Sequence, residues 1–358
     1  MRPGGAGPAG LVAGPAAALA GVGALVMMSA ASQVNPALAS RHLLWIALGA
    51  LSAAALSRAN YRRWTQAAAV VYGLSVLTLL SVPLAGAMRL GATRWLSIFG
   101  FSVQPAELAK LATILLLAQY LSVQPAPLPS RALAASAAIA GVPAALIFLQ
   151  PDLGSASVLL AIWLGLAGVA GLPRRTWAAL GAAAAVVLPL GWHILKDYQR
   201  DRLLVFLNPH RDPLGAGYTI IQSVIAIGSG RLFGRGWFAG TQNQLSFLPE
   251  RHSDFIFSVV GEEWGFAGCL LVVGLFALLL RGVARVAAAT SDPHGRLLAV
   301  GIFTWLGYQA GVNIGMVMGL LPVVGVPLPL LSYGGSSMVM IWTAVGLLHS
   351  IRRSDALP

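Results

Sequence analysis

About ten apolar stretches, each close to the length of a membrane span, follow one another along this chain of 358 residues. A helix needs roughly 20 apolar residues to cross a bilayer, and it satisfies its backbone hydrogen bonds internally. Charged residues make up only 9% of the chain, far below the share in soluble domains. The sequence therefore predicts an all-α polytopic membrane protein, with spans at approximately 9–30, 42–57, 66–86, 105–122, 132–149, 153–170, 175–195, 255–280, 296–319 and 334–351.

No polar segment is long enough for a separate soluble domain, so we treat residues 1–358 as a single membrane domain. The longest polar segment, residues 196–254, joins the seventh and eighth spans. Loops of this length are usually functional or disordered, and this one is rich in Gly, aromatic and amide residues, so we expect it to fold against the helices. The apolar N-terminus resembles a signal sequence, but similar runs follow it, and we interpret it as an uncleaved first span.

The net charge of +12 raises the question of a nucleic-acid partner. The basic residues lie in short clusters between spans, which is the pattern of the positive-inside rule and not of one basic patch. We therefore expect no nucleic acid. The pattern places both termini in the cytoplasm and the 196–254 loop outside the cytoplasmic membrane, with cytoplasmic clusters at Arg2, at Arg58, Arg62 and Arg63, at Arg131, at Arg174 and Arg175, at Arg281, Arg285 and Arg296, and at Arg352 and Arg353.

Two charged residues, Glu107 and Lys110, lie three positions apart on one face of the fourth span. Charges inside membrane helices are costly and are usually paired or functional. Two interpretations stay open. The residues form either a self-neutralising pair that fastens helices, or a site in which Lys110 holds an anionic substrate that Glu107 positions.

Other polar residues between the spans have simpler interpretations. Asp152 is placed to cap the sixth span, which makes it structural. In the Gly-rich stretch 228–236, Arg231 and Arg235 suit bidentate contacts with phosphate or lipid headgroups, although loop packing explains them equally well. The His residues show no HExxH or CxxC spacing, so we predict no protein-held metal site.

The stretch Asn313–Ser337 contains Pro322, Pro327 and Pro329, which interrupt the helix at membrane depth. Irregular backbone is tolerated there only against protein or a water-filled cavity. The stretch is therefore expected either to line a substrate groove or to form a re-entrant hairpin.

These features occur together in a series of ordered motifs, which are Gly91–Trp95 (GATRW), Gln104–Lys110, Gln150–Gly154, Asp197–Pro213, Gly215–Gly236, Gly240–Gln242, Phe247–Gly265 and Asn313–Ser337. With these motifs the chain resembles the SEDS family (shape, elongation, division and sporulation), and its RodA members more than its FtsW or SpoVE members. The resemblance covers spans two to ten. Arg231 departs from the pattern, because Gly commonly stands there.

The resemblance implies a ten-span peptidoglycan glycosyltransferase that polymerises lipid II into β-1,4 glycan strands on the outer face of the membrane and releases undecaprenyl diphosphate. It implies an essential acid at Asp254, an essential charge pair at Glu107 and Lys110, and a sensitive position at Trp95. Its implied partners are a class B penicillin-binding protein, which supplies the transpeptidase in cell elongation, lipid II and membrane lipids. A divalent cation, Mg²⁺ or Mn²⁺, is compatible with the diphosphate, but no ligand cluster demands one. The candidate substrate-binding residues are Lys110, Glu107, Trp95, Arg94, Arg231 and Arg235.

The chemistry fits a single base. Converting an α-linked diphosphate sugar into a β linkage inverts the anomeric centre, which one displacement achieves with a base on the acceptor and stabilised charge on the leaving group. The paired acids of glycosidases are then not required. Asp254, where the long loop meets the eighth span, is predicted to be that base, and the alternative is an ordinary N-cap.

Two other functions compete with this prediction. The first is a flippase for the lipid-linked precursor, which the broken helices and intramembrane charges would suit. The sequence shows no convincing internal repeat, and its acids crowd the external side, which weighs against a flippase. The second is a non-enzymatic scaffold of a cell-wall complex, which leaves the charged groups without a purpose.

Overall fold

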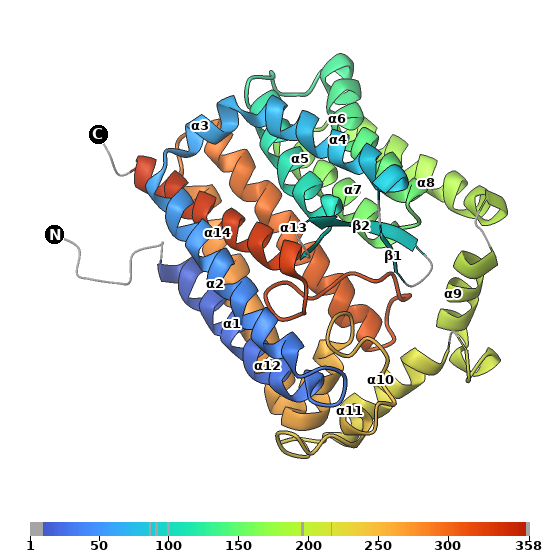
Figure 1. The fold of residues 1–358 in the computed structure, drawn as a ribbon. Helices are drawn as coiled ribbons and strands as arrows, with labels where there is room; N and C mark the ends of the chain where they lie inside the picture. Colours follow the sequence, from blue (N-terminus) through green and yellow to red (C-terminus); the bar gives the residue numbers. More distant parts are fainter. Residues whose placement is uncertain are drawn as a thin grey trace.

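The computed structural model of the chain describes residues 10–85, 87–89, 92–98, 101–194, 197–215 and 217–355. Its helices form one bundle, in which the beginning of α1 and the end of α14 lie at the same end (Figure 1). The helices are α1 (Gly10–Ala31), α2 (Ala37–Arg58), α3 (Tyr61–Gln66), α4 (Ala68–Ala85), α5 (Pro105–Ser122), α6 (Ser130–Leu149), α7 (Leu153–Val169), α8 (Arg174–Ile194), α9 (Asp197–Leu207), the 3-10 helix η1 (Pro209–Arg211), α10 (Tyr218–Ser229), α11 (Thr241–Gln244), α12 (Ile256–Ala289), α13 (Pro293–Val317) and α14 (Gly335–Asp355).

The predicted spans coincide with long helices, which confirms the polytopic helical fold. They correspond, in chain order, to α1, α2, α4 to α8 and α12 to α14. Five of these, α1, α2, α6, α12 and α13, are long and apolar enough to cross a membrane by length and composition alone. The predicted cytoplasmic Arg2 lies outside the described residues. Side by side in the bundle are α2 with α14, α1 with α12, and α12 with α13.

The eighth span is longer than its predicted range of 255–280, because α12 continues to Ala289. The apolar run ends at Arg281, but Arg and Ala are strong helix formers and extend the helix beyond it. The link to α13 is therefore short. It ends at Asp292, whose side chain caps α13 by accepting from the backbone N–H of His294, with Pro293 at the first helical position.

A small sheet between α4 and α5 was not predicted. It consists of β1 (Ala87–Arg89), β2 (Ala92–Ile98) and β3 (Phe101–Val103) in the antiparallel order β1-β2-β3. Ala87 pairs with Trp95, and Leu96 pairs with Val103. β1 and β3 have too few residues for an alternating pattern, and β2 does not alternate strictly between apolar and polar residues.

The long 196–254 segment is folded, as predicted, over the part of it that the structure describes. It contains α9, η1, α10 and α11, and α10 lies against α12 and α13. The Ser223 hydroxyl donates to the Val317 carbonyl at 2.6 Å and lies 2.8 Å from the Ser258 hydroxyl, so buried polar contacts hold α10 in place. These elements lie at the end of the bundle opposite the start of α1 (Figure 1).

Residues 318–334, which we call the central segment, join α13 to α14 without regular helix. Gly319 and Gly325 have φ of 72° and 71°, which glycine adopts at little cost. Neighbouring helices approach the segment closely. A Cβ on Gly23 of α1 would lie 2.8 Å from the Leu331 Cα, and one on Gly154 of α7 would lie 2.6 Å from the Val324 carbonyl oxygen. The segment thus fills the space between α1 and α7.

Candidate functional site

Asp254 lies half-buried in the turn that precedes α12. The N-cap residue of α12 is Phe255, which makes no side-chain capping hydrogen bond, so Asp254 does not occupy the cap position. Asp254 directly precedes this cap position, and both its role as the base and its role as an acid at the helix start stay predictions. The carboxylate faces the central segment, because a Cβ built on Gly325 would lie 3.5 Å from Asp254 Oδ2.

Three consecutive carbonyls hold the backbone of this turn. The His252 oxygen accepts from the Tyr333 backbone N–H at 2.8 Å. The Ser253 oxygen accepts from the Ser332 hydroxyl at 2.6 Å. The Asp254 oxygen accepts from the Asn313 amide at 2.9 Å. Buried backbone groups are almost always paired, and here every partner comes from α13 or the central segment. The position of Asp254 is therefore set by residues far along the chain.

The charge pair predicted in α5 is present. Lys110 Nζ lies 2.7 Å from Glu107 Oε1, and each side chain is only 1% exposed. Lys110 also donates to Gln309 Oε1 of α13 at 3.0 Å and lies 5.3 Å from the ring centre of Trp305. The second Glu107 oxygen, Oε2, has no hydrogen-bond partner among the described residues. The pair therefore links α5 to α13 and leaves one carboxylate oxygen unsatisfied.

Two amides of α13, Gln309 and Asn313, connect the charge pair with the Asp254 turn. They stand one helical turn apart and are fully buried. Gln309 Nε2 donates to the Pro327 carbonyl at 2.9 Å, and Asn313 Nδ2 donates to the adjacent Val326 carbonyl at 2.7 Å as well as to Asp254. One continuous polar network thus runs from Glu107 to Asp254.

Sequence reasoning did not name Gln309, and it included Asn313 only as the first residue of the Asn313–Ser337 stretch, with no role of its own. A signal was available, since two amides at i, i+4 spacing in an apolar span are expected to face the bundle interior. Their partners, however, lie in the central segment and in the Asp254 turn. No local pattern identifies those partners.

The predicted residues around the sheet form a separate group. Arg94 in β2 donates from Nε to the Gln150 carbonyl at 3.2 Å and from its guanidinium to the Pro151 carbonyl. Asp152 caps α7, as predicted, by accepting from the Ser155 backbone N–H at 3.0 Å. Arg94 therefore holds the turn before α7. Trp95 is half-buried in β2 beside it, and Gly91 of the same motif lies outside the described residues.

Arg231 and Arg235 are both exposed and lie elsewhere. Their loop is bonded to α12 near Glu262, which the Arg235 backbone N–H contacts at 3.0 Å. Glu262 follows Asp254 by eight residues, which corresponds to about 12 Å along a helix. The structure thus does not bring these two arginines together with the Asp254 turn.

Two buried acids of α12, Glu262 and Glu263, were also not predicted as site residues. Glu262 accepts from the backbone N–H groups of Gln242 and Asn243 at 2.7 and 3.1 Å. Glu263 accepts from the Ser29 hydroxyl at 2.5 Å and from the Asn243 amide at 2.9 Å. These carboxylates fix the start of α11 and the end of α1 against α12.

Two titratable neighbours of Asp254 in the turn, Arg251 and His252, have lowered pKa values. Burial lowers the pKa of Arg251, whose guanidinium donates to the Ala30 carbonyl at 3.0 Å and to the Ser246 hydroxyl at 3.2 Å. Burial also lowers the pKa of His252, with Arg251 acting in the same direction and Glu250 opposing. Burial therefore disfavours the protonated form of His252, and the Arg251 guanidinium is held by contacts with α1 and with Ser246.

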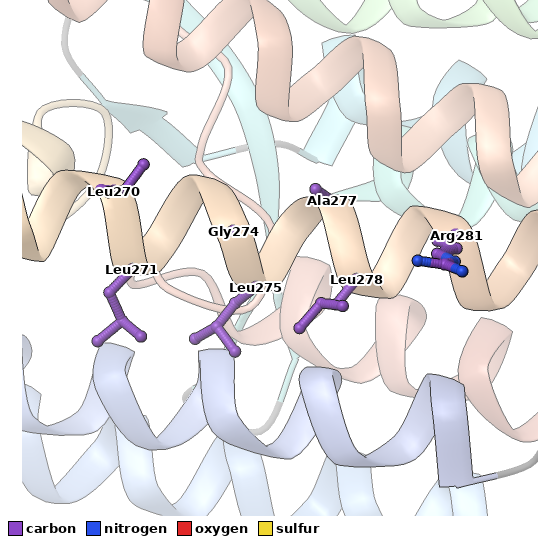
Figure 2. A pocket seen from close by; sticks show the side chains of 7 residues that line it. All are labelled: Leu270, Leu271, Gly274, Leu275, Ala277, Leu278 and Arg281. Atoms are coloured by element: carbon purple, nitrogen blue, oxygen red, sulfur yellow. The ribbon is translucent and has the colours of Figure 1, made fainter.

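A surface depression of about 430 Å³ lies along α12 and contains none of these groups (Figure 2). Apart from Arg281, its lining is apolar, comprising Leu270, Leu271, Gly274, Leu275, Ala277 and Leu278. Chemistry on a polar substrate needs polar groups, so we place the candidate site at the Asp254 turn. Within the described ranges, no three His, Cys, Asp or Glu side chains gather to hold a metal ion.

The sequence profile of the cell cycle protein family that includes FtsW, RodA and SpoVE matches residues 15–356. The chain is 40% identical over 332 residues to the peptidoglycan glycosyltransferase MrdB of Escherichia coli K12, covering 92% of this chain and 89% of that protein. The fold is similar to a chain from a structural study of polymerisation and crosslinking by a peptidoglycan synthase complex, with a TM-score of 0.84, 37% identity and coverage of 97% and 98%. It is also similar to the crystal structure of the rod shape determining protein RodA of Thermus thermophilus, with a TM-score of 0.73, 32% identity and 97% of both chains covered. The chain is therefore a member of the cell cycle protein family of FtsW, RodA and SpoVE.

Proposed function

We propose that this multi-pass membrane protein is a peptidoglycan glycosyltransferase that polymerises lipid II into β-1,4 glycan strands during cell elongation. The similarity to MrdB supports this reaction class. The observation that carries it is the Asp254 turn, in which three consecutive carbonyls are held by α13 and the central segment beside a half-buried carboxylate. Such preorganisation is what a base needs to act on a bound hydroxyl.

In this proposal Asp254 accepts the proton of the acceptor sugar hydroxyl. The hydroxyl oxygen forms a bond to the anomeric carbon of the donor while the bond from that carbon to the diphosphate breaks. The diphosphate leaves with the electron pair as undecaprenyl diphosphate, so the α-linked donor gives a β linkage. A diphosphate is a good leaving group and needs charge stabilisation more than protonation. One carboxylate is therefore sufficient for the displacement.

The buried charge pair has a positioning role in the same proposal. Lys110 is closed to solvent in this conformation, and its ammonium contacts Glu107 and Gln309. Through Gln309 the pair fixes the carbonyl of Pro327, next to the carbonyl that binds Asn313. Direct contact of Lys110 with an anionic substrate, one of the two interpretations drawn from the sequence, requires the ammonium to leave its contacts with Glu107 and Gln309.

We further propose that the chain lies in the bacterial cytoplasmic membrane with both termini inside and works with a class B penicillin-binding protein. The complex in which the similar solved chain was studied, one of polymerisation and crosslinking, supports such a partner. The placement of the described ends of α1 and α14 at the same end of the bundle is consistent with this topology.

The test is polymerisation of purified lipid II by the purified chain, with and without the transpeptidase partner, followed by size separation of the glycan products. Long glycan strands are expected in the presence of the partner. A flippase predicts the opposite pattern, with transfer of labelled lipid II across proteoliposomes and no polymer. Transfer without polymer would overturn the proposal.

A further inference from the structure

Helix α12 is interrupted at Gly265, and a loop of residues 230–238 supplies the hydrogen bonds that the interruption removes. Gly265 has φ of 66°, which is outside helical geometry. We call residues 230–238 the kink loop. Its backbone bonds to α12 are Phe266 N–H to Arg231 O at 2.8 Å, Ala267 N–H to Leu232 O at 3.0 Å, Arg235 N–H to Glu262 O at 3.0 Å, and Gly236 N–H to Glu263 O at 3.1 Å.

The kink loop approaches α12 so closely that side chains are excluded at two positions. A Cβ on Gly230 would lie 1.9 Å from the Gly261 carbonyl oxygen, and one on Gly234 would lie 2.0 Å from that of Glu263. Real Cβ atoms do not come so near backbone oxygen. The kink loop is therefore held rigidly against α12, and its side chains point in a defined direction.

The depth of the kink loop in the membrane follows from distances along the two helices that it contacts, α12 and α1. Near the other end of the bundle, a Cβ on Gly282 of α12 would lie 2.4 Å from the Leu11 carbonyl of α1, so these two residues are level. Gly265 is 17 residues from Gly282, which is about 25 Å along a helix. The Trp237 indole N–H of the kink loop donates to the Leu25 carbonyl at 3.2 Å, and Leu25 is 14 residues, about 21 Å, from Leu11.

The hydrocarbon layer of a bilayer is about 30 Å thick. Arg281, beside Gly282, is taken as the inner boundary of this layer. Measured from there, the distances along α12 and along α1 both place the kink loop near the outer edge of the hydrocarbon layer and not in bulk water. Non-helical backbone is tolerated at this depth only when protein satisfies its polar groups. The hydrogen bonds to α12 meet that condition.

The side chains of the kink loop suit this depth. Leu232 and Phe233 are 64% and 83% exposed, and the exposed rings of Trp237 and Phe238 lie 4.9 Å apart. Aromatic residues are enriched at the interface between lipid and water. Arg231 and Arg235 are exposed beside them, and long basic side chains at this depth extend their charged ends toward headgroups.

We propose that the kink loop is a lipid-binding site. Its apolar side chains enter the outer leaflet, and Arg231 and Arg235 bind the phosphates of phospholipids. Guanidinium groups make strong, bidentate contacts with phosphate. Because the kink loop is bonded to α12 and the Asp254 turn begins the same helix, this site holds the outer end of α12 at a fixed depth.

The depth is tested with the full chain in phospholipid nanodiscs. In a Cys269→Ala background, which removes the one cysteine of the chain, single spin labels are placed at Phe233→Cys, Leu25→Cys and Val34→Cys. Leu25 lies at the inferred depth, and Val34 lies beyond the end of α1. Collision with oxygen, which concentrates in lipid, is expected to exceed collision with a water-soluble nickel chelate at residues 233 and 25, with the reverse at residue 34. A Phe233 label that behaves like the Val34 label would overturn the proposal.

The arginines are tested by native mass spectrometry of the chain with phosphatidylglycerol. The double variant R231Q/R235Q is expected to retain fewer phosphatidylglycerol molecules than the parent. Arg211→Gln, an exposed arginine in η1 outside the kink loop, is the matched control and is expected to retain the parental number. Equal retention by the double variant and the parent would remove the two arginines from lipid binding.

Discussion

Asp254 is the residue on which the proposed chemistry depends. Asp254→Asn keeps the shape of the side chain and does not disturb the backbone carbonyl that binds Asn313. It removes the ability to accept the hydroxyl proton, a contribution of typically about 10²–10⁴-fold in rate. The purified variant is expected to fold, to bind lipid II and to assemble with its transpeptidase partner, yet to make almost no glycan. Near-normal glycan synthesis, measured by gel separation of the products, would remove Asp254 from the mechanism.

Asn313 is expected to act through Asp254 and not on the substrate. Asn313→Ala leaves the buried carbonyls of Asp254 and Val326 without this donor, and small misplacements of a catalytic group are costly, so we expect a loss of roughly 10–100-fold in polymerisation rate. In the Asp254→Asn background the same change should cost little more, because the base it positions is already gone.

The control for this comparison is Asn60→Ala, which removes an amide cap from α3 while α13 keeps its contacts. It should lower the unfolding temperature slightly and leave the rate unchanged. Additive losses in the double variant Asn313→Ala/Asp254→Asn would show that Asn313 does not work through Asp254.

At the scale of elements, α5 and α13 meet through the charge pair. Replacing Glu107 with Leu and Lys110 with Met together removes the pair without leaving an unpaired buried charge, a change that is often nearly neutral for stability. We expect this double variant to fold but to polymerise poorly, because Gln309 loses the ammonium that orients it. Lys110→Met alone leaves Glu107 buried without its partner and should unfold at lower temperature. A fully active double variant would return the pair to a purely structural role.

The elements themselves were largely predictable, because each span carries its own apolar signal. The connections were less so. In the small sheet, β1 and β3 have three residues each, too few to show a period, and the seven residues of β2 (ATRWLSI) do not alternate between apolar and polar. The break at Gly265 is invisible in the sequence, since an isolated glycine is tolerated inside a helix. The kink loop that repairs the break comes from more than 25 residues earlier in the chain.

The sequence predicted several residues of the candidate site but not how they are arranged in space. The motif around Asp254 was found, but its partners Asn313 and Ser332 lie 59 and 79 residues away in sequence. The sequence grouped Arg231 and Arg235 with the substrate, whereas the structure places them in a loop bonded to α12 near Glu262, a residue about 12 Å along the helix from the Asp254 turn. Spatial grouping of this kind depends on how helices pack, which no single segment encodes.

The two ends of the helix bundle define how the whole molecule is oriented in the membrane. The beginning of α1 and the end of α14 share one end of the bundle, and the short link between α12 and α13 follows Gly282, which lies against Leu11 near the start of α1. Ser291 in this link is exposed and should therefore be on the same side as the termini. The opposite end carries α10 and α11 (Figure 1). The excess of arginine near Ser291 predicts that its side is cytoplasmic.

Cysteine labelling decides this orientation. In a Cys269→Ala background, Leu214→Cys, which is 89% exposed, and Val34→Cys are expected to react with an impermeant thiol reagent added to intact spheroplasts. Ser291→Cys should react only after the membrane is opened. Because the proposed polymerisation uses lipid II on the outer face, the Asp254 turn must be on the side of Leu214. Labelling of Ser291→Cys in intact spheroplasts, with protection of Leu214→Cys, would invert the topology and place Asp254 on the wrong side of the membrane for this reaction.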